Sequence, residues 1–94
     1  MNYSKVFFGS VQHGIDKKAA SMAAKVDKIL EMLDFSTIDR KDKVCIKMHL
    51  GFEDGYQTIP VFFVRRIVQA VKQFSQNIFI TDNPTAVFNA VDRG

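Results

Sequence analysis

The run from Val44 to Gly51, VCIKMHLG, constrains the fold more than any other stretch of this chain. It has the length and apolar content of a core strand, yet it contains Lys47 and His49 two residues apart. In a strand this spacing places both side chains on one face, roughly 6–7 Å apart, and leaves the opposite face apolar. A charge inside a sheet that is covered on both faces is costly unless it is paired or reaches solvent. We therefore expect that something at the end of this strand, a charged partner or a ligand, requires the cation of Lys47 and the imidazole of His49.

Strands and helices are predicted to alternate along the chain. Three strands are expected from short runs rich in Val, Ile and Phe, at 5–11, 44–50 and 77–81. Asp16 is expected to cap a first helix, whose apolar stripe is Ala19, Met22, Val26, Ile29, Leu30 and Leu33. Pro60 suits the first turn of a second helix that runs to about Phe74. The order βαβαβ is typical of an α/β fold with a parallel, three-layer, Rossmann-like sheet.

The chain of 94 residues is predicted to be a single α/β domain over 1–94, or the amino-terminal fragment of a longer protein. Three strands are few for a parallel sheet, which needs cover on both faces. The tail TAVFNAVDRG has the pattern of a helix that stops abruptly. We expect homo-oligomers that form through an exposed sheet edge or through the second helix, where Phe62 lies among polar residues.

Composition narrows the partners and the compartment. The formal net charge is only +3, and no basic stripe interleaved with aromatic residues is present, so nucleic acid is not expected as a partner. The single cysteine, Cys45, cannot form an internal disulfide and is expected to be a buried, inert thiol in a reducing compartment. No secretory signal and no apolar run of membrane-spanning length is present, so we expect a soluble, cytoplasmic protein without a membrane partner.

Polar residues are predicted to gather at one edge of the sheet. In an open parallel sheet, ligands bind outside the carboxyl ends of the strands. The residues expected to bind a ligand there are Lys47, His49, Gly51, Thr81 and Asp82, with Ser10, Gln12, His13, Glu53, Asp54 and Asn83 at the same edge. The ammonium of Lys47 suits a small anionic ligand, a carboxylate or a phosphate, although its stem could instead pack on a helix with the charge paired to Asp82. No catalytic residue can be named.

A metal site at this edge has little support in the sequence. His13, His49, Asp82 and either Glu53 or Asp54 could supply nitrogen and oxygen ligands, but no local spacing such as HxxxH is present. The loop GFEDGYQT precedes a helix, where backbone N–H groups can hold an anion, but its two acids would repel phosphate. We therefore expect its glycines to serve the turn geometry, and we expect no metal in this chain.

Three parts of the chain together resemble a known family. They are IKMHLG; the helix with Pro60, Val64, Arg65, Val68 and Lys72; and the strand that ends in Thr81-Asp82, with Gly51, Gly55 and Thr58 in the loop between. This combination resembles the "domain of unknown function 362" family, which is described as uncharacterised iron–sulfur-centre proteins. The resemblance covers most of residues 3–94 and is strongest over 44–82. Two features depart from the family pattern: no glycine lies in 74–77, and Cys45 alone cannot ligate an iron–sulfur cluster.

The resemblance implies one function, and the residues leave two others open. It implies an uncharacterised α/β domain of a redox-associated, ferredoxin-like iron–sulfur protein, with no cofactor in this chain and the cluster in a missing carboxyl-terminal part. The first alternative is a ligand-binding or enzymatic α/β domain without redox function, in which Lys47 and Asp82 form a polar clamp. The second is an interaction module. The resemblance implies no particular reaction, because the chemistry of that family is not established.

Overall fold

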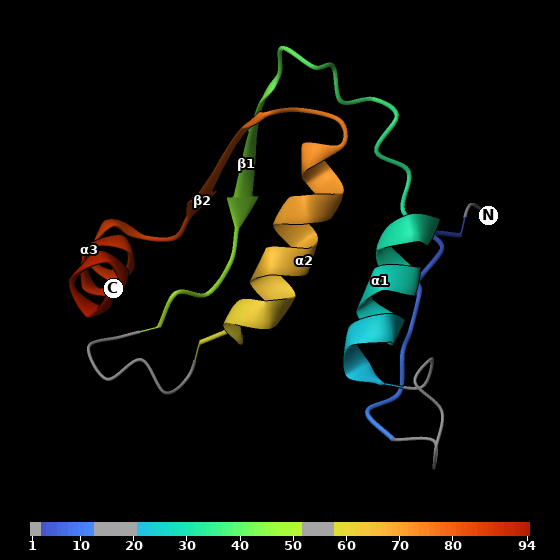
Figure 1. Cartoon of the computed structure of the whole chain (residues 1–94), viewed down its shortest axis with the longest axis horizontal. Coiled ribbons are helices and arrows are strands. Elements are labelled where there is room, and N and C mark those ends of the chain that lie inside the picture. Colours follow the sequence, from blue (N-terminus) through green and yellow to red (C-terminus); the bar gives the residue numbers. More distant parts are fainter. Residues whose placement is uncertain (1–2, 13–20, 52–57) are drawn as a thin grey trace.

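The computed structural model describes residues 3–12, 21–51 and 58–94 and forms a mixed α/β structure (Figure 1). The elements in chain order are α1 (Met22–Met32), β1 (Lys43–Lys47), α2 (Val61–Lys72), β2 (Asn77–Thr81) and α3 (Pro84–Arg93). None of the helices in these ranges is long and apolar enough to cross a membrane.

The sheet of the described residues has two strands, β1 and β2, which are parallel and are connected through α2. Their register pairs Lys43 with Asn77 at one end and Lys47 with Thr81 at the other. The prediction of a mixed α/β fold is confirmed, as is the strand over 77–81. The three-layer Rossmann-like sheet is not confirmed, because only two strands are present in the described ranges.

The strand predicted at 5–11 is wrong for this structure. Residues 3–12 form no strand and run beside α1 (Figure 1). The ammonium of Lys25 donates to the carbonyl oxygens of Ser10 and Gln12, at 2.5 and 2.6 Å, and the position of a Cβ on Gly9 would be 3.4 Å from Ile29. Contacts with the helix thus replace the ladder hydrogen bonds that the apolar pattern predicts for this segment.

Helix boundaries follow local capping chemistry. Ser21 is the N-cap of α1, since its hydroxyl accepts from the Ala24 N–H at 3.2 Å, whereas the predicted cap Asp16 lies outside the described residues. Pro60, predicted in the first turn of the second helix, is instead the N-cap residue directly before α2, and α2 ends at Lys72, two residues before the predicted end. The predicted tail helix is α3, where the side chain of Asn83 accepts from the Ala86 N–H at 2.9 Å and Pro84 occupies the first turn.

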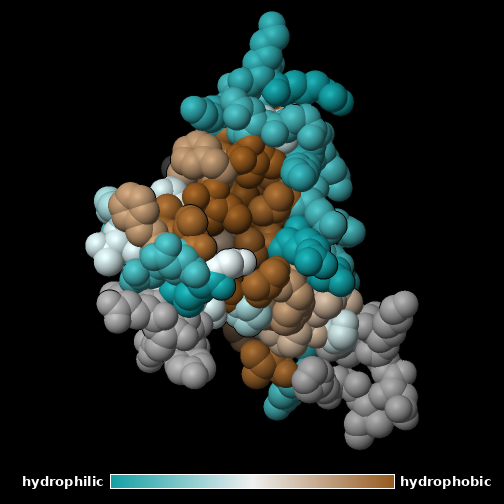
Figure 2. Space-filling view, turned by 60° about the vertical axis from the view of Figure 1, so that its left-hand side comes forward, coloured by the Kyte–Doolittle hydropathy of each residue, from teal (hydrophilic) through white to brown (hydrophobic). Residues whose placement is uncertain are grey.

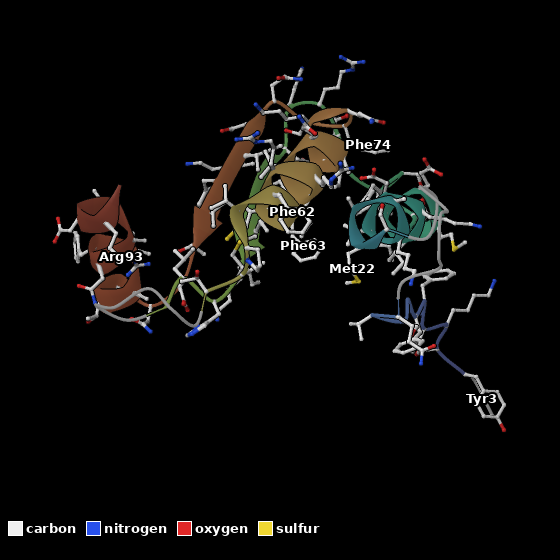
Figure 3. All side chains as sticks on the ribbon, turned by 60° about the horizontal axis from the view of Figure 1, so that its bottom comes forward. Tyr3, Met22, Phe62, Phe63, Phe74 and Arg93 are labelled. Atoms are coloured by element: carbon white, nitrogen blue, oxygen red, sulfur yellow. The ribbon has the colours of Figure 1, made fainter. Side chains whose placement is uncertain are left out.

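Helix α2 lies between the sheet and α1, so it covers one face of the sheet (Figure 3). The stripe predicted to face inward, Phe63, Val64, Ile67, Val68, Val71 and Phe74, is buried or half-buried throughout. Along β1 the apolar side chains are half-buried and the intervening ones exposed, as the alternation predicts. Cys45 is exposed, so the expectation of a buried thiol is wrong: in the described residues no helix is packed on its face of the sheet.

The fully buried apolar core is small. In the described residues it comprises Met48, Val71 and Ala86, and Ser75 is the buried polar residue. Figure 2 shows apolar residues gathered in a continuous area in the middle of one face, with hydrophilic residues around it. Much of the apolar surface that could form a core therefore stays in contact with solvent.

A polar contact joins the strands at their amino ends. The Ser75 hydroxyl donates to the carbonyl oxygen of Asp42 at 2.6 Å and accepts from the N–H of Asn77 at 3.1 Å. Asp42 directly precedes β1 and Asn77 begins β2. Ser75 is 1% exposed, so these bonds are shielded from water and help to hold the register of the two strands.

Candidate functional site

The carboxyl edge of the sheet is where the predicted site residues meet. Strand β1 ends at Lys47 and β2 at Thr81, and these two residues are register partners. The N–H of Met48 donates to the carbonyl oxygen of Thr81 at 3.1 Å, which extends the pairing by one residue. His49 and Leu50 lie beyond the strand, so the strand predicted at 44–50 ends earlier than expected. This parallel register brings Asp82, directly after β2, beside the chain that leaves β1.

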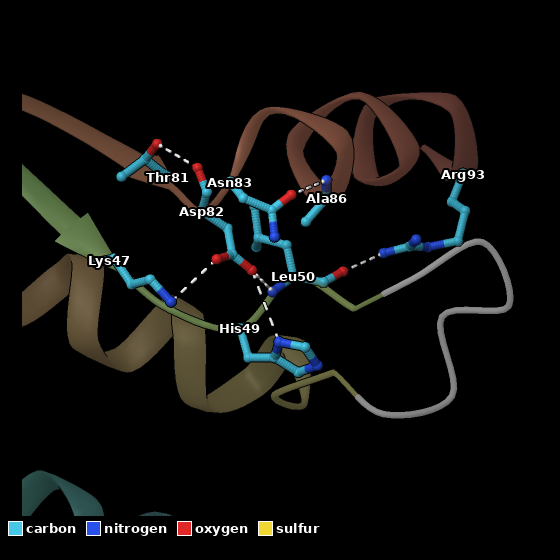
Figure 4. A network of polar contacts seen from close by, with 8 residues as sticks. All are labelled: Lys47, His49, Leu50, Thr81, Asp82, Asn83, Ala86 and Arg93. Atoms are coloured by element: carbon cyan, nitrogen blue, oxygen red, sulfur yellow. Dashed lines mark hydrogen bonds and ion pairs between the residues drawn. The ribbon is translucent and has the colours of Figure 1, made fainter.

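The carboxylate of Asp82 is the centre of this site (Figure 4). Its Oδ1 lies 3.0 Å from the Nζ of Lys47, and its Oδ2 accepts from the N–H of Leu50 at 3.0 Å. The Nδ1 of His49 lies 3.7 Å from Oδ2. The side chain of Asp82 is 6% exposed. A nearly buried carboxylate therefore contacts Lys47, His49 and Leu50, which all lie at or just beyond the end of β1.

These contacts keep Asp82 ionised. The N–H of Leu50, the ammonium of Lys47 and the N–H of Asn83, in that order of effect, lower the pKa of Asp82 to about 2. Hydrogen bonds to a carboxylate favour its charged form and outweigh the opposing effect of burial here. Asp82 is therefore an anion throughout the physiological range, and in the structure it acts as an acceptor that positions its neighbours.

The two basic side chains face solvent. The side chain of Lys47 is 68% exposed and that of His49 is 47% exposed, in contrast to the carboxylate that holds them. An ammonium has three N–H donors and its contact with one carboxylate oxygen leaves donor capacity toward solvent. The edge thus exposes the ammonium of Lys47 and the imidazole of His49 to solvent, and both lie next to the nearly buried carboxylate of Asp82.

Gly51 and Thr81 have supporting positions at this edge. Gly51 is buried and has a φ of 79°, a left-handed conformation that residues with a Cβ rarely adopt. The hydroxyl of Thr81 donates to the backbone carbonyl of Asp82 at 3.3 Å and is not directed to the carboxylate (Figure 4). Lys47, His49 and Asp82 are brought together as the sequence predicts, and the other two predicted residues shape the backbone around them.

Arg93 is a residue of this edge that sequence reasoning missed. Its guanidinium, from the last turn of α3, donates to the carbonyl oxygen of Leu50 at 2.5 Å (Figure 4). The N–H of the same residue, Leu50, donates to Asp82, so both backbone groups of Leu50 are used. Nothing in the local pattern predicts this contact, although Asn83-Pro84 is a helix-start signal that would have placed α3 next to the edge.

Other residues predicted for this edge lie elsewhere or outside the described ranges. Ser10 and Gln12 lie beside α1, where their carbonyl oxygens bind Lys25, because the first predicted strand is not formed. His13, Glu53 and Asp54 are outside the described residues. Among the residues that the structure describes, no group of three or more His, Cys, Asp or Glu is arranged to hold a metal ion.

Comparisons with known proteins add no family. The chain matches no protein-family model, no curated protein and no solved structure. The likeness of IKMHLG and its neighbouring motifs to the "domain of unknown function 362" family therefore stays an expectation that depends on those residues alone.

Proposed function

We propose that the carboxyl edge of the sheet binds a small anionic ligand through Lys47 and His49. The observation that supports this is the Asp82 carboxylate, which is 6% exposed and lies within 3.0 Å of the Lys47 ammonium. A buried carboxylate orients the cation while leaving it largely in solvent. The ion pair already restricts the side chain of Lys47. Lys47 would therefore lose less conformational entropy when it binds a ligand.

The described charged side chains of the site include two cations and one anion. Lys47 and Arg93 are positive and Asp82 is negative, whereas Glu53 and Asp54, which the sequence predicts at the same edge, lie outside the described residues. Carboxylates and phosphates are the anions for which lysine donors are commonly used. Either class fits the exposed donors, and the experiment below distinguishes them.

The proposed location also agrees with how parallel sheets are used. Ligands of open α/β sheets bind beyond the carboxyl ends of the strands. We propose that the β1–α2–β2 unit is one part of a larger Rossmann-like, three-layer sheet, whose further strands and covering helices complete the crevice. Association with an iron–sulfur protein stays a prediction carried by the family resemblance, and the presence of a cluster-binding, cysteine-rich segment in the same polypeptide is the feature that would support it.

Titration of the protein with inorganic phosphate and with acetate, followed by amide chemical shifts, tests the site. We expect saturable shifts at Leu50 and its neighbours, with the preferred anion giving the tighter binding curve. Lys47→Gln removes the charge and is expected to weaken binding about tenfold or more, as for the loss of a charged hydrogen bond. Lys43→Gln is the matched control, because Lys43 is on the same face of β1 but instead lies over the ring of Phe79.

Two results would contradict the proposal. Equal binding by wild type and Lys47→Gln would remove Lys47 from the site. Shifts that are linear in anion concentration and equally large in both lysine variants would indicate general ionic-strength effects and no site.

A second candidate function is proton transfer by His49. The Nδ1 of His49 lies 3.7 Å from the Oδ2 of Asp82, and a carboxylate near one ring nitrogen can orient an imidazole for acid–base chemistry. This proposal needs a substrate that binds at the same edge. His49→Gln is therefore expected to weaken anion binding, because the imidazole is lost, and to abolish any turnover of a bound ester or phosphoester at saturating substrate, measured by product release.

A further inference from the structure

One face of the two-stranded sheet is exposed and carries mostly polar side chains. Side chains alternate along each strand, and register partners in a parallel pair share a face. The open face therefore has three rows of two residues, which are Lys43 and Asn77, Cys45 and Phe79, and Lys47 and Thr81. All are exposed except Thr81, which is half-buried. The opposite face differs in composition, since its strand residues are half-buried and aliphatic: Val44, Ile46, Ile78 and Ile80.

Phe79 places an aromatic ring in the middle of this open face. It is the central residue of β2 and is 43% exposed. The ammonium of Lys43 lies over the ring, 5.8 Å from its centroid, and this cation–π contact restrains the ring. The thiol of Cys45, the register partner of Phe79, is exposed as well. In the described residues the ring is therefore accessible from solvent.

Lys47, which we propose as an anion-binding residue, lies on the same face as this ring. It is two residues beyond Cys45, the register partner of Phe79. Two residues along a strand span about 6.6 Å and one step across the sheet about 4.8 Å, so the Cα atoms of Lys47 and Phe79 lie about 8 Å apart. The Lys47 side chain is 68% exposed and is held by Asp82 (Figure 4). One small molecule can thus contact the ring and the ammonium together.

The residues of the open face favour a ligand that is both flat and anionic. Direct packing of a helix on Lys43 and Lys47 would bury ammonium groups at a cost. A flat anion instead offers the ring a stacking partner and the Lys47 ammonium a counter-charge. In the larger three-layer sheet proposed above, such a ligand would lie between the open face and its covering layer.

We infer that the ligand of this site is an anion that carries an aromatic ring, with its anionic group on Lys47 and its ring stacked on Phe79. The inference rests on the anion site proposed above and adds the chemical class of the ligand. The shared chemistry is a planar π-system joined through a short linker to a phosphate, as in a nucleotide, or to a carboxylate, as in an aromatic acid.

Matched anions with and without a ring test the inference. Dissociation constants are measured from the amide shifts of Leu50 and Phe79. The phosphate series is inorganic phosphate, ribose 5-phosphate and adenosine monophosphate, and the carboxylate pair is acetate and phenylacetate. Stacking of a base on an aromatic side chain raises affinity by about fivefold to a hundredfold. We expect a gain of this size for adenosine monophosphate over ribose 5-phosphate or for phenylacetate over acetate, and the larger gain identifies the source of the ring.

Three variants locate the ring contact. Phe79→Leu keeps an apolar side chain but removes the ring, and we expect it to bring the ratio of affinities within the matched pair close to one. Phe79→Tyr keeps a ring and should preserve the ratio. Phe88→Leu is the matched control, because Phe88 is also exposed, at 69%, but lies on α3. It should show the wild-type ratio, and the amide spectrum of each variant checks that the fold is retained.

The outcomes separate this inference from the anion site on which it rests. Simple anions that bind through Lys47 and gain nothing from a ring overturn the inference and leave the anion site in place. A gain that persists in Phe79→Leu also overturns it, because the ring then stacks elsewhere. If no anion binds in a way that depends on Lys47, with or without a ring, the proposed anion site is wrong and the inference is wrong with it.

Discussion

The Nζ of Lys47 lies 3.0 Å from the Oδ1 of Asp82, and this ion pair joins the carboxyl ends of the two parallel strands. Lys47 is the last residue of β1, and Asp82 directly follows β2. At the opposite ends of the same strands, Ser75 bonds the residue before β1 and the first residue of β2. In addition to the backbone ladder, side-chain contacts thus join the two strands at each end of the sheet.

Asp82→Asn is expected to disrupt the carboxyl end without unfolding the protein. The amide keeps the shape of the carboxylate but loses the charge that attracts Lys47, and it can no longer offer two anionic oxygens. We expect a melting temperature lower by several degrees and a large change in the amide shift of Leu50. Asp92→Asn, on the exposed face of α3, is the control and should change neither quantity.

Acid stability should report the lowered pKa of Asp82. Its pKa is about 2 in the folded protein against an ordinary value of 3.8, so the folded state favours the ionised form. The resulting stabilisation is complete above about pH 4 and is lost as the pH falls through 2. Urea midpoints measured between these pH values should fall steeply for wild type and less steeply for Asp82→Asn. Equal slopes for the two proteins would contradict this assignment.

Ser75→Ala is expected to lower the free energy of unfolding by about 1–2 kcal/mol, since it removes two hydrogen bonds at a position shielded from water. Ser75 is 1% exposed, and its hydroxyl bonds Asp42 and Asn77. Chemical denaturation gives the value. Ser4→Ala, at an exposed position, is the control and should be neutral. A neutral Ser75→Ala would mean that the strand ends are held by packing alone.

The thiol of Cys45 should be reactive in the native protein, because it is exposed on the open face of the sheet. The rate with a thiol-specific chromogenic reagent is expected to be within a few-fold of the rate in urea. A native rate lower by orders of magnitude would mean that this face is covered in solution, as the sequence-based expectation of a buried thiol implies.

The pattern of apolar and polar residues predicted single elements, and the faces of single elements, correctly in several places. The alternation in VCIKMHLG predicts correctly which side chains of β1 are half-buried and which are exposed, because the strand period depends only on the backbone. The apolar stripe of α2 and the bounds of β2 follow from periodicity in the same way. The parallel register then makes a contact between Lys47 and Asp82 foreseeable, and the structure contains it.

Contacts that do not follow from the pairing of the two strands could not be foreseen. Residues 5–11 have the composition of a strand, but Lys25 and Ile29 hold this segment against a helix, so its pattern alone did not decide its structure. The guanidinium of Arg93 reaches the carbonyl oxygen of Leu50 only because α3 folds back toward the edge. Cys45 is exposed because no second layer covers its face of the sheet in the described residues. Its exposure therefore depends on which elements pack on the sheet and cannot be predicted from the sequence of the strand.

The sequence by itself determined β1, α2 and β2 and the face of β1 on which Lys47 lies, since helix and strand periods are properties of the local backbone. Only the tertiary structure decided that a nearly buried Asp82 carboxylate holds the Lys47 ammonium while Lys47 and His49 remain open to solvent. The physical reason is that burial and ion pairing depend on which segments meet, and the free energy of a charge depends on that environment.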